Sequence, residues 1–428
     1  MLSRMEHDSI GALNVPAEAY YGVQSMRAAT NFQITHRPLH PVLIDSIVMV
    51  KKAAAITNEK SGKLDQQIVQ AIIQACDEIL DGNLRDQFIV DAIQGGDGTS
   101  ANMNANEVIA NRAIEILGGT KGDYSVVHPN DHVNMSQSTN DVIPTAGKIT
   151  VLKLLPQTIK ELEKLEKAME EKEAEFDDIL KMGRTQLQDA VPMRLGQSFG
   201  AFAHVLKRDI KRLKNVMDEM KVLNIGATAI GTAINVDPYY LANISYELSK
   251  VAGISLKQAD DLIDATQNLD GFVSVSGVLK TCAVDISKIS NDLRLMSSGP
   301  RTGLSEINLP ARQNGSSIMP GKINPVIPEV VSQVVYLIIG HDYTITMAAE
   351  AGQCEKYIEK SVGISTALCP YIGYAKSAEI AKKSLKTGIS VKELVLEEGL
   401  LKEEELKEIL KPEKMTQPMR EKVMKAVS

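Results

Sequence analysis

Long apolar stripes at helical spacing are the feature that most restricts how this chain can fold. One stripe has steps of three or four residues and consists of Leu152, Leu155, Ile159, Leu162, Leu165 and Met169. A second stripe has the same steps and consists of Val275, Leu279, Cys282, Ile286, Ile289, Leu293 and Met296. Such spacing places each stripe on one face of a helix. A helix over 271–297 would be on the order of 40 Å long, so the stripes predict an elongated helical bundle.

Chain length and composition support a mainly all-α protein of several domains. The 428 residues are enough for two or three domains and a large core. Aromatic residues make up 4% and Trp is absent, which favours helix-on-helix packing through aliphatic side chains. We predict an N-terminal domain over 1–140, a central helical bundle over 141–353 and a small C-terminal helical domain over 354–428.

Charge and cysteine usage exclude several classes of protein. The net charge of −7 argues against a general nucleic-acid-binding protein. The sequence has no apolar run of about 18 residues, and its start lacks the apolar core of a signal peptide. The four cysteines lack metal-site spacing and are expected to be buried free thiols of a reducing compartment: Cys76, Cys282, Cys354 and Cys369. We therefore expect a cytoplasmic protein without membrane or nucleic-acid partners.

The remaining elements follow from local signals. Residues 1 to about 40 are expected to be irregular, because prolines and glycines interrupt them. Helices are expected near 44–60, 65–81, 85–93 and 239–252, and another one is expected to start near Pro328. The tail over 371–428 is expected to form short helices separated by Gly and Pro.

The segment 315–325, GSSIMPGKINP, is the strongest candidate for a binding loop. It ends a Gly- and Pro-rich connection over 299–325 that has no periodicity of its own, and such a connection is usually functional. Lys322 and Asn324 offer a cation and an amide, which suit a carboxylate ligand. The competing interpretation is a surface loop with a chance lysine.

Three further polar segments interrupt the helical pattern, at 95–106, 128–144 and 183–192. The first can be interpreted as a turn, a capping cluster or an anion site at a helix start. One or two residues of 136–141 should cap the following helix, and 183–192 is interpreted as a polar turn. Together with the loop they supply hydroxyls, amides and one lysine. This set suits proton transfer and stabilisation of a carboxylate-bearing substrate.

Five stretches in sequence order resemble the aspartase/fumarase superfamily, whose members eliminate an amine or water to form fumarate. They are GTSANMNANEVIANRA from Gly98, HPND followed by SQSTND from His128, GRTQLQDAVP from Gly183, GATAIGTAIN from Gly226 and the loop from Gly315. Fumarases usually have NMNVNE, a histidine at position 186 and GGTAVG. This chain instead has NMNANE, Gln186 and GATAIG, which favour the aspartase branch.

The resemblance implies an anti elimination of ammonia from L-aspartate, with Ser316 as the alkoxide base that takes the Cβ proton. It implies carboxylate binding by Thr99, Ser138, Thr139 and Thr185. Asn140 and Gln186 would hold the amino group or its neighbouring carboxylate. Lys322, Asn324 and the backbone around Ser317 would stabilise anions, and Glu329 matches a family carboxylate that partners residue 186. The His128 turn resembles a secondary anion site of fumarases and is not expected to be catalytic.

The resemblance also implies a three-domain fold around a long-helix bundle and a homotetramer whose active sites are each assembled from three subunits. No cofactor is expected, and activation by Mg²⁺ is expected from the resemblance alone. We predict no metal ligand among the site residues.

The sequence departs from the family in two places. Asp97 stands where the family usually has alanine, and its charge should repel a dicarboxylate by about 1 kcal/mol at a surface dielectric. After Gln353 the family continues into another long apolar helix before the counterpart of Cys354, whereas here the join is direct. The loss of a core helix should expose apolar faces on its neighbours.

These observations leave alternatives to the interpretation of the chain as an aspartase. One is a fumarate hydratase or another lyase of the superfamily. Another is an inactive shortened relative, including a non-catalytic helical assembly protein that kept the fold. Intact Ser316, Lys322 and Asn324 count against an inactive protein.

Overall fold

A computed structural model describes residues 2–351, 362–411 and 415. Contacts divide the chain into two compact units. Unit 1 comprises Met1–Val151, Lys221–Asn268 and Gln353–Ser428, and unit 2 comprises Leu152–Met220 and Leu269–Gly352. Helices dominate both units, which confirms the mainly all-α fold class. The division into three domains at 140 and 353 stays a prediction.

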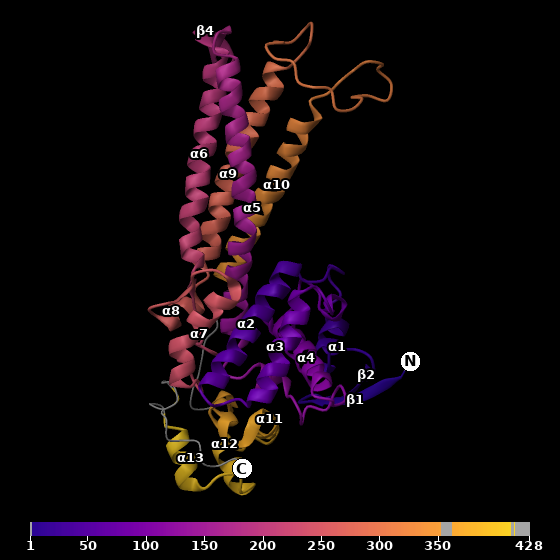
Figure 1. The fold of residues 1–428 in the computed structure, drawn as a ribbon, viewed down its shortest axis with the longest axis vertical. Helices are drawn as coiled ribbons and strands as arrows, with labels where there is room; N and C mark the ends of the chain where they lie inside the picture. Colours follow the sequence, from indigo (N-terminus) through magenta and orange to yellow (C-terminus); the bar gives the residue numbers. More distant parts are fainter. Residues whose placement is uncertain (1, 352–361, 412–414, 416–428) are drawn as a thin grey trace. The chain divides into compact units, whose positions relative to one another are not determined.

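Unit 2 is a bundle of long helices (Figure 1). It contains most of α5 (Thr139–Glu175) together with α6 (Leu195–Met220), α9 (Asp270–Met296) and α10 (Val326–Glu350). The stripes predicted from the sequence point into this bundle: Leu152, Leu155, Ile159 and Leu162 of α5 are each at most 6% exposed. Leu206 and Leu213 of α6 are fully buried. The predicted long helices are therefore confirmed, and their apolar faces build the core.

Polar contacts also join the helices of unit 2. Asp342 of α10 accepts hydrogen bonds from Ser276 Oγ at 2.8 Å and Lys280 Nζ at 2.6 Å, both on α9. Helices α5 and α6 are connected by strands β3 (Leu180–Thr185) and β4 (Gln188–Arg194), which form an antiparallel hairpin at the end of the bundle (Figure 1). The segment 183–192, predicted as a polar turn, thus forms parts of both strands, and only Gln186 and Leu187 form the turn between them.

Unit 1 contains the helices α2 (Pro41–Lys60), α3 (Gln66–Leu80), α4 (Thr99–Ile116), α7 (Pro238–Ala252) and α8 (Leu262–Gln267). Asp65 caps α3 by accepting from the backbone N–H of Gln67, and Asp237 caps α7 by accepting from that of Tyr239. The short strands β5 (Val222–Leu223) and β6 (Lys257–Gln258) pair in parallel. The helices predicted near 44–60, 65–81 and 239–252 are confirmed.

The helix predicted over 85–93 is wrong. Only a 3₁₀ turn, η1 (Arg85–Gln87), forms there. The side chain of Asn104 on α4 accepts from Ile89 N and donates to Gln87 O, and Ala92 N donates to Arg37 O. These tertiary partners take the backbone groups that a helix would have paired locally.

The N-terminal 40 residues are more ordered than their prolines and glycines predicted. Strands β1 (Ser3–Asp8) and β2 (Gly11–Pro16) form an antiparallel hairpin, and α1 (Val23–Asn31) follows. The buried carboxylate of Glu107 accepts from the backbone N–H groups of Gly22, Gln24 and Ser25 at the start of α1. A distant residue thus satisfies donors that no local cap reaches.

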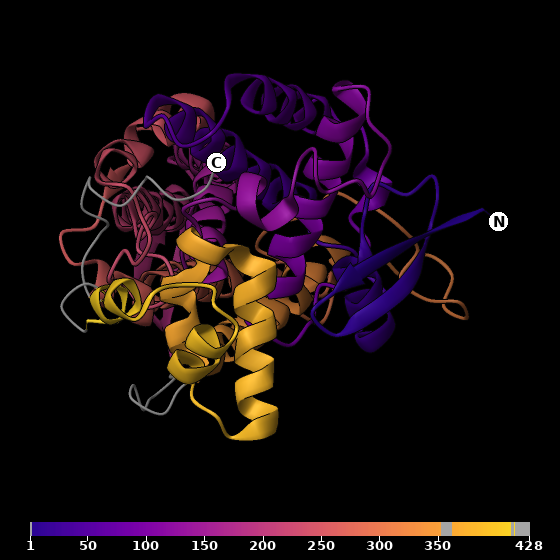
Figure 2. The ribbon, with the colours of Figure 1, turned by 90° about the horizontal axis from the view of Figure 1, so that it is seen from below.

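Short helices form the C-terminal part of unit 1 (Figure 2): η3 (Val362–Leu368), α11 (Cys369–Thr387), α12 (Val391–Glu397) and α13 (Glu403–Ile409). Leu368, Ile380, Leu394 and Leu406 are fully buried in their shared core. The short helices predicted for the tail are confirmed over the described residues. The direct join after Gln353 lies outside the described residues. Across the described ranges, no helix is long and apolar enough to cross a membrane.

Candidate active site

The Gly-rich loop is closed at its neck by backbone pairing. Asn314 and Ile323 form an antiparallel bridge, and Gly315 N donates to Lys322 O at 2.8 Å. Asn324 Nδ2 donates to Gly315 O at 3.1 Å. A Cβ atom on Gly315 would lie 2.7 Å from Asn324 Oδ1 and 2.8 Å from Asn324 N. Glycine is required here because the two sides of the neck approach so closely.

Ser316 lies just beyond this neck. Its Oγ accepts hydrogen bonds from Ile318 N at 3.3 Å and Met319 N at 3.2 Å. Two backbone donors aimed at one hydroxyl oxygen stabilise the anion that forms when the hydroxyl loses its proton. Ser317 and Lys322 are exposed in the same loop, and Asn324 is half-buried at the neck. The predicted loop residues therefore share one loop, in which Ser316 Oγ has two backbone donors.

The hairpin β3–β4 presents Thr185 and Gln186 at the same end of unit 2 (Figure 1). Thr185 pairs with Gln188, so Gln186 and Leu187 are the two residues of the turn. Their φ angles are 50° and 64°. Such turns normally use Asn or Gly, so two larger residues in the left-handed region mark local strain of the kind found at functional sites. Both Thr185 and Gln186 are exposed, as is Glu329 in the first turn of α10.

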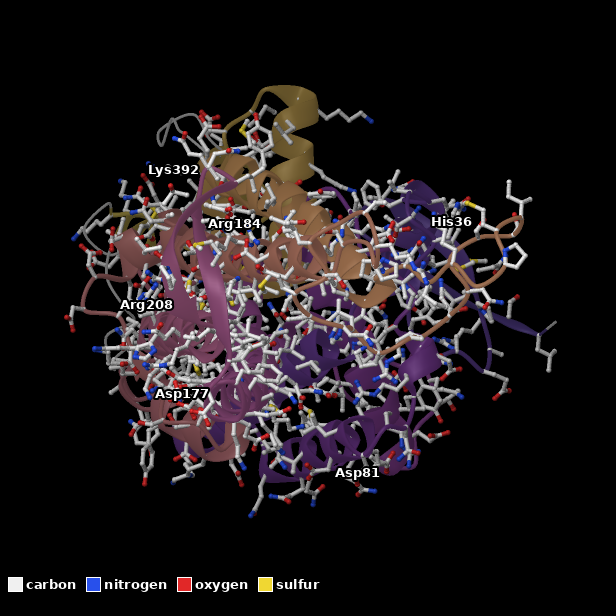
Figure 3. All side chains as sticks on the ribbon, turned by 90° about the horizontal axis from the view of Figure 1, so that it is seen from above. His36, Asp81, Asp177, Arg184, Arg208 and Lys392 are labelled. Atoms are coloured by element: carbon white, nitrogen blue, oxygen red, sulfur yellow. The ribbon has the colours of Figure 1, made fainter. Side chains whose placement is uncertain are left out.

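An ion cluster that the sequence did not reveal joins the hairpin to the beginning of the loop connection. Glu306 lies 2.9 Å from Lys181 Nζ and 2.6 Å from Arg184 Nη2 (oxygen-to-nitrogen distances). Burial acts to raise the pKa of Glu306, but the hydrogen bonds and charges of Arg184 and Lys181 hold it below its usual range. Figure 3 labels Arg184 on the hairpin. The only signal in the sequence was a lone carboxylate within 299–325.

In unit 1, the predicted residues gather at the starts of α4 and α5. Ser138 caps α5, because its Oγ accepts from Asn140 N while its own N–H donates to Asp141 Oδ1. Asn102 Nδ2 of α4 lies 3.4 Å from Thr139 Oγ1. Asn140 Nδ2 donates to Ala229 O at 2.7 Å. The cap predicted within 136–141 is thereby confirmed.

Thr99 is the first residue of α4 and is exposed, and its Oγ1 donates to Gly96 O at 2.7 Å. It follows Gly98, where an added Cβ would lie 2.8 Å from Ile143 Cγ1 on α5. This close approach brings Thr99 to the start of α5. Asp97 is exposed beside it with a φ of 51°. The repulsion expected from its carboxylate stays a prediction.

Beneath these helix starts lies a buried lysine that the sequence did not mark as a site residue. Lys51 is fully buried on α2, and its Nζ donates to Asn134 Oδ1 at 2.8 Å and to Gln137 Oε1 at 3.0 Å. Asn134 Oδ1 also accepts from Asn102 Nδ2 at 3.1 Å. Burial lowers the pKa of Lys51 to about 7, although the negative charge of Asp141 acts to raise it. The network holds the segment before α5 in place.

The predicted site residues are distributed over both units. Unit 1 contains Thr99, Ser138, Thr139 and Asn140. Unit 2 contains Thr185, Gln186, Ser316, Ser317, Lys322, Asn324 and Glu329. Unit 2 offers a serine oxygen that accepts from two backbone N–H groups, with a lysine in the same loop, and this set suits proton abstraction. Unit 1 by itself offers neutral hydroxyls and amides, which suit a carboxylate-bearing ligand.

Comparison with known proteins gives consistent matches along the chain. The lyase family model matches residues 11–340, and the model of the fumarase C C-terminus matches residues 364–417. An aspartate ammonia-lyase from Bacillus sp is 49% identical over 97% of this chain and 98% of its own length. The aspartate ammonia-lyase of Escherichia coli K12 is 45% identical over 97% of this chain and 96% of its own.

Solved structures agree with these matches. A fumarate lyase:delta crystallin from Brucella melitensis superposes with a TM-score of 0.81 at 47% identity, covering 97% of this chain and 100% of that one. A class II fumarase from Schistosoma mansoni gives a TM-score of 0.79 at 32% identity over 97% and 99%. The long-helix bundle with its serine loop thus defines a lyase. The chain belongs to the aspartase/fumarase superfamily, in its aspartate ammonia-lyase branch.

The chain has fewer residues than its alignments with the relatives have positions. The alignment with the Bacillus relative runs over 457 positions, whereas 97% of 428 residues is about 415. About 40 aligned positions therefore have no residue in this chain. The sequence predicts that a helix is missing after Gln353, and the position of the missing residues in the alignment stays a prediction.

Proposed function

We propose that this enzyme catalyses the reversible anti elimination of ammonia from L-aspartate to give fumarate, with Ser316 as the base. The Ser316 alkoxide takes the proton from Cβ, the C–H electron pair becomes the carbon–carbon double bond, and the C–N bond breaks to release ammonia. The supporting observation is the pair of backbone N–H groups, from Ile318 and Met319, that donate to Ser316 Oγ. They lower the cost of forming an alkoxide at an otherwise weakly acidic hydroxyl.

The remaining residues are assigned to substrate binding. Lys322 and Asn324 supply positive charge and an amide in the same loop as Ser316, which suits the dianion that develops after proton removal. Thr99, Ser138, Thr139 and Thr185 supply hydroxyls for the two carboxylates. Asn140 and Gln186 hold the amino group or its neighbouring carboxylate, and Glu329 supports residue 186. Because Gln186 does not titrate, the proposal contains no His–Glu proton relay.

The test is Ser316→Ala, assayed by the ultraviolet absorbance of fumarate formed from L-aspartate, with L-malate in parallel. We expect kcat to fall at least about 100-fold, which is the low end for loss of a general base. Thr302→Ala is the matched control, because Thr302 is exposed in the same connection without being assigned to the site. Full activity of Ser316→Ala would disprove the assignment, and fumarate from malate alone would make the enzyme a hydratase.

We propose no cofactor for this chemistry. Among the described residues, no group of three or more His, Cys, Asp or Glu side chains could hold a metal ion. No step of the proposed mechanism uses a metal ion. Activation by Mg²⁺, which the family resemblance implies, is tested by adding it to metal-free enzyme: a higher rate supports it and an unchanged rate contradicts it.

We also propose a cytoplasmic homotetramer with shared active sites. Helix α10 exposes a broad apolar face, as expected of a helix that packs on another subunit, with Val330, Val334, Tyr336, Leu337, Tyr343 and Met347 each 46–69% exposed. Cys76 and Cys282 are buried free thiols as predicted, whereas Cys369 is a half-buried free thiol, and Cys354 lies outside the described residues. Free thiols suit a reducing compartment.

A further inference from the structure

Three charged side chains meet where the hairpin β3–β4 contacts the segment that follows α9. Glu306 Oε2 pairs with Lys181 Nζ, and Glu306 Oε1 pairs with Arg184 Nη2. The three side chains are only 12–21% exposed, so water screens them less than it screens a surface pair. Because each carboxylate oxygen has its own cation, the orientation of Glu306 is fixed. We call Lys181, Arg184 and Glu306 the Glu306 clamp.

The segment that carries Glu306 is also fastened to the end of α9. Glu306 N donates to Met296 O at 2.8 Å, and Ser305 N donates to Ser298 O at 2.9 Å. Leu304 N donates to Ser298 Oγ at 3.0 Å. A Cβ atom on Gly303 would lie 2.4 Å from Ser298 O, so this turn is tightly folded. Residues 298–307 are therefore a compact turn held by α9 on one side and by the hairpin on the other.

The chain beyond this turn is held much less. Residues 308–313 lie outside every helix, strand and backbone hydrogen bond found among the described residues, and all but Leu309 are exposed. Backbone pairing resumes only at the bridge between Asn314 and Ile323. The Ser316 loop is thus attached through an unpaired link of six residues to a turn that the clamp fixes.

We propose that Glu306 is a positioning residue, which holds the fixed end of the Ser316 loop against the strand that leads to Thr185 and Gln186. The clamp thereby sets both the point from which Ser316 reaches the substrate and the orientation of the hairpin tip. This inference rests on the proposed function, because it assigns a catalytic consequence to the way in which the Ser316 loop is attached.

The test variant is Glu306→Gln, which keeps the size of the side chain and removes its charge. We expect kcat to fall about 10- to 100-fold with less than a threefold change in KM, because a displaced base costs more in the transition state than in binding. The matched control is Asp342→Asn, which breaks the pairing with Lys280 and Ser276 within the same bundle. It should leave kcat within twofold.

A second measurement does not depend on activity. In Glu306→Gln, amide hydrogen exchange should accelerate at least fivefold in 298–307 and in the hairpin 180–194, and it should stay unchanged in Asp342→Asn. In a double-mutant cycle, Arg184→Gln should add less than threefold to the kcat loss of Glu306→Gln, because both substitutions remove the ion pair between Glu306 and Arg184.

Three results would overturn the proposal: unchanged exchange in 298–307, a kcat within twofold of the wild type, or equal losses in Glu306→Gln and Asp342→Asn. Failure of the proposed function is separate, because it appears as full activity of Ser316→Ala while the exchange result for the clamp stands.

Discussion

At the scale of single residues, burial changes the chemistry of groups that look ordinary in the sequence. Lys51 lies in an unremarkable Lys-Lys-Ala-Ala segment, yet it is fully buried and holds Asn134 and Gln137. Glu306 is one carboxylate in a Gly- and Pro-rich connection, yet it pairs with two cations. In both cases the partners are distant in sequence, and the electrostatic environment follows from them.

Lys51 should make stability depend on pH in a defined window. Its pKa is about 7 in the folded protein, whereas a free lysine loses its proton near 10.5. Between these values only the unfolded chain holds the proton, so a rise in pH stabilises the folded state relative to the unfolded state. We compare the free energy of unfolding of the wild type with that of Lys51→Met. The wild-type value minus the variant value should rise by up to about 1.4 kcal/mol for each pH unit in this window.

The measurement is urea unfolding at pH 7 to 9 and at one protein concentration, because assembly would otherwise shift the apparent stability. Lys51→Met is compared with the wild type at each pH, so the other titrating groups cancel. A difference that stays flat across the window contradicts the assignment of a lowered pKa to Lys51.

At the scale of elements, close backbone approaches hold the site loops. The neck of the Ser316 loop depends on the absence of a side chain at Gly315, since an added Cβ would overlap Asn324. The hairpin tip carries Gln186 and Leu187 in left-handed conformations that Asn or Gly would adopt more readily. The neck thus has the residue that its geometry requires, whereas the hairpin turn keeps a geometry that its local sequence does not favour.

Gly315→Ala should damage activity far more than stability. The added methyl group opens the neck and displaces Ser316, so kcat/KM should fall about 100-fold. The loop is exposed, so the free energy of unfolding should change by less than about 1 kcal/mol. Gly277→Ala on α9 is the control, because nothing lies within 4 Å of its added Cβ. Normal kcat/KM in Gly315→Ala would show that the neck tolerates opening.

At the scale of the whole molecule, the exposed side chains of α10 are the most informative surface. Tyr336 and Leu337 are 68% and 61% exposed on a helix whose other side packs on α9. Large apolar side chains in such numbers on one helix mark an interaction surface. The alignment difference of about 40 positions bears on the same question, because a missing helix would change what covers this surface.

The double change Tyr336→Glu and Leu337→Glu should dissociate the assembly, because it buries two carboxylates in an apolar contact. Analytical ultracentrifugation should give a lower mass than for the wild type, and activity should fall with it. Leu385→Glu is the control, since Leu385 is 72% exposed on α11. A wild type that is already monomeric, or a double variant of unchanged mass, would contradict the proposed tetramer.

Features that depend on local periodicity and local polar chemistry could be predicted from the sequence. The stripes over 152–169 and 275–296 fixed long amphipathic helices, because every third or fourth residue must leave water together. The composition of 315–325 identified the loop, and the polar run over 136–141 identified a helix cap, because both depend on neighbouring residues.

Contacts between groups that are distant in sequence could not be predicted and follow from the packing of the folded chain. Residues 85–93 look helical, but Asn104 takes their backbone partners, and the N-terminal 40 residues look irregular until Glu107 satisfies the start of α1. Local sequence likewise cannot show that Lys181 and Arg184 converge on Glu306, more than 100 positions away. Hydrogen bonds and ion pairs act over a few ångströms, so they depend on which segments the packed helices bring together.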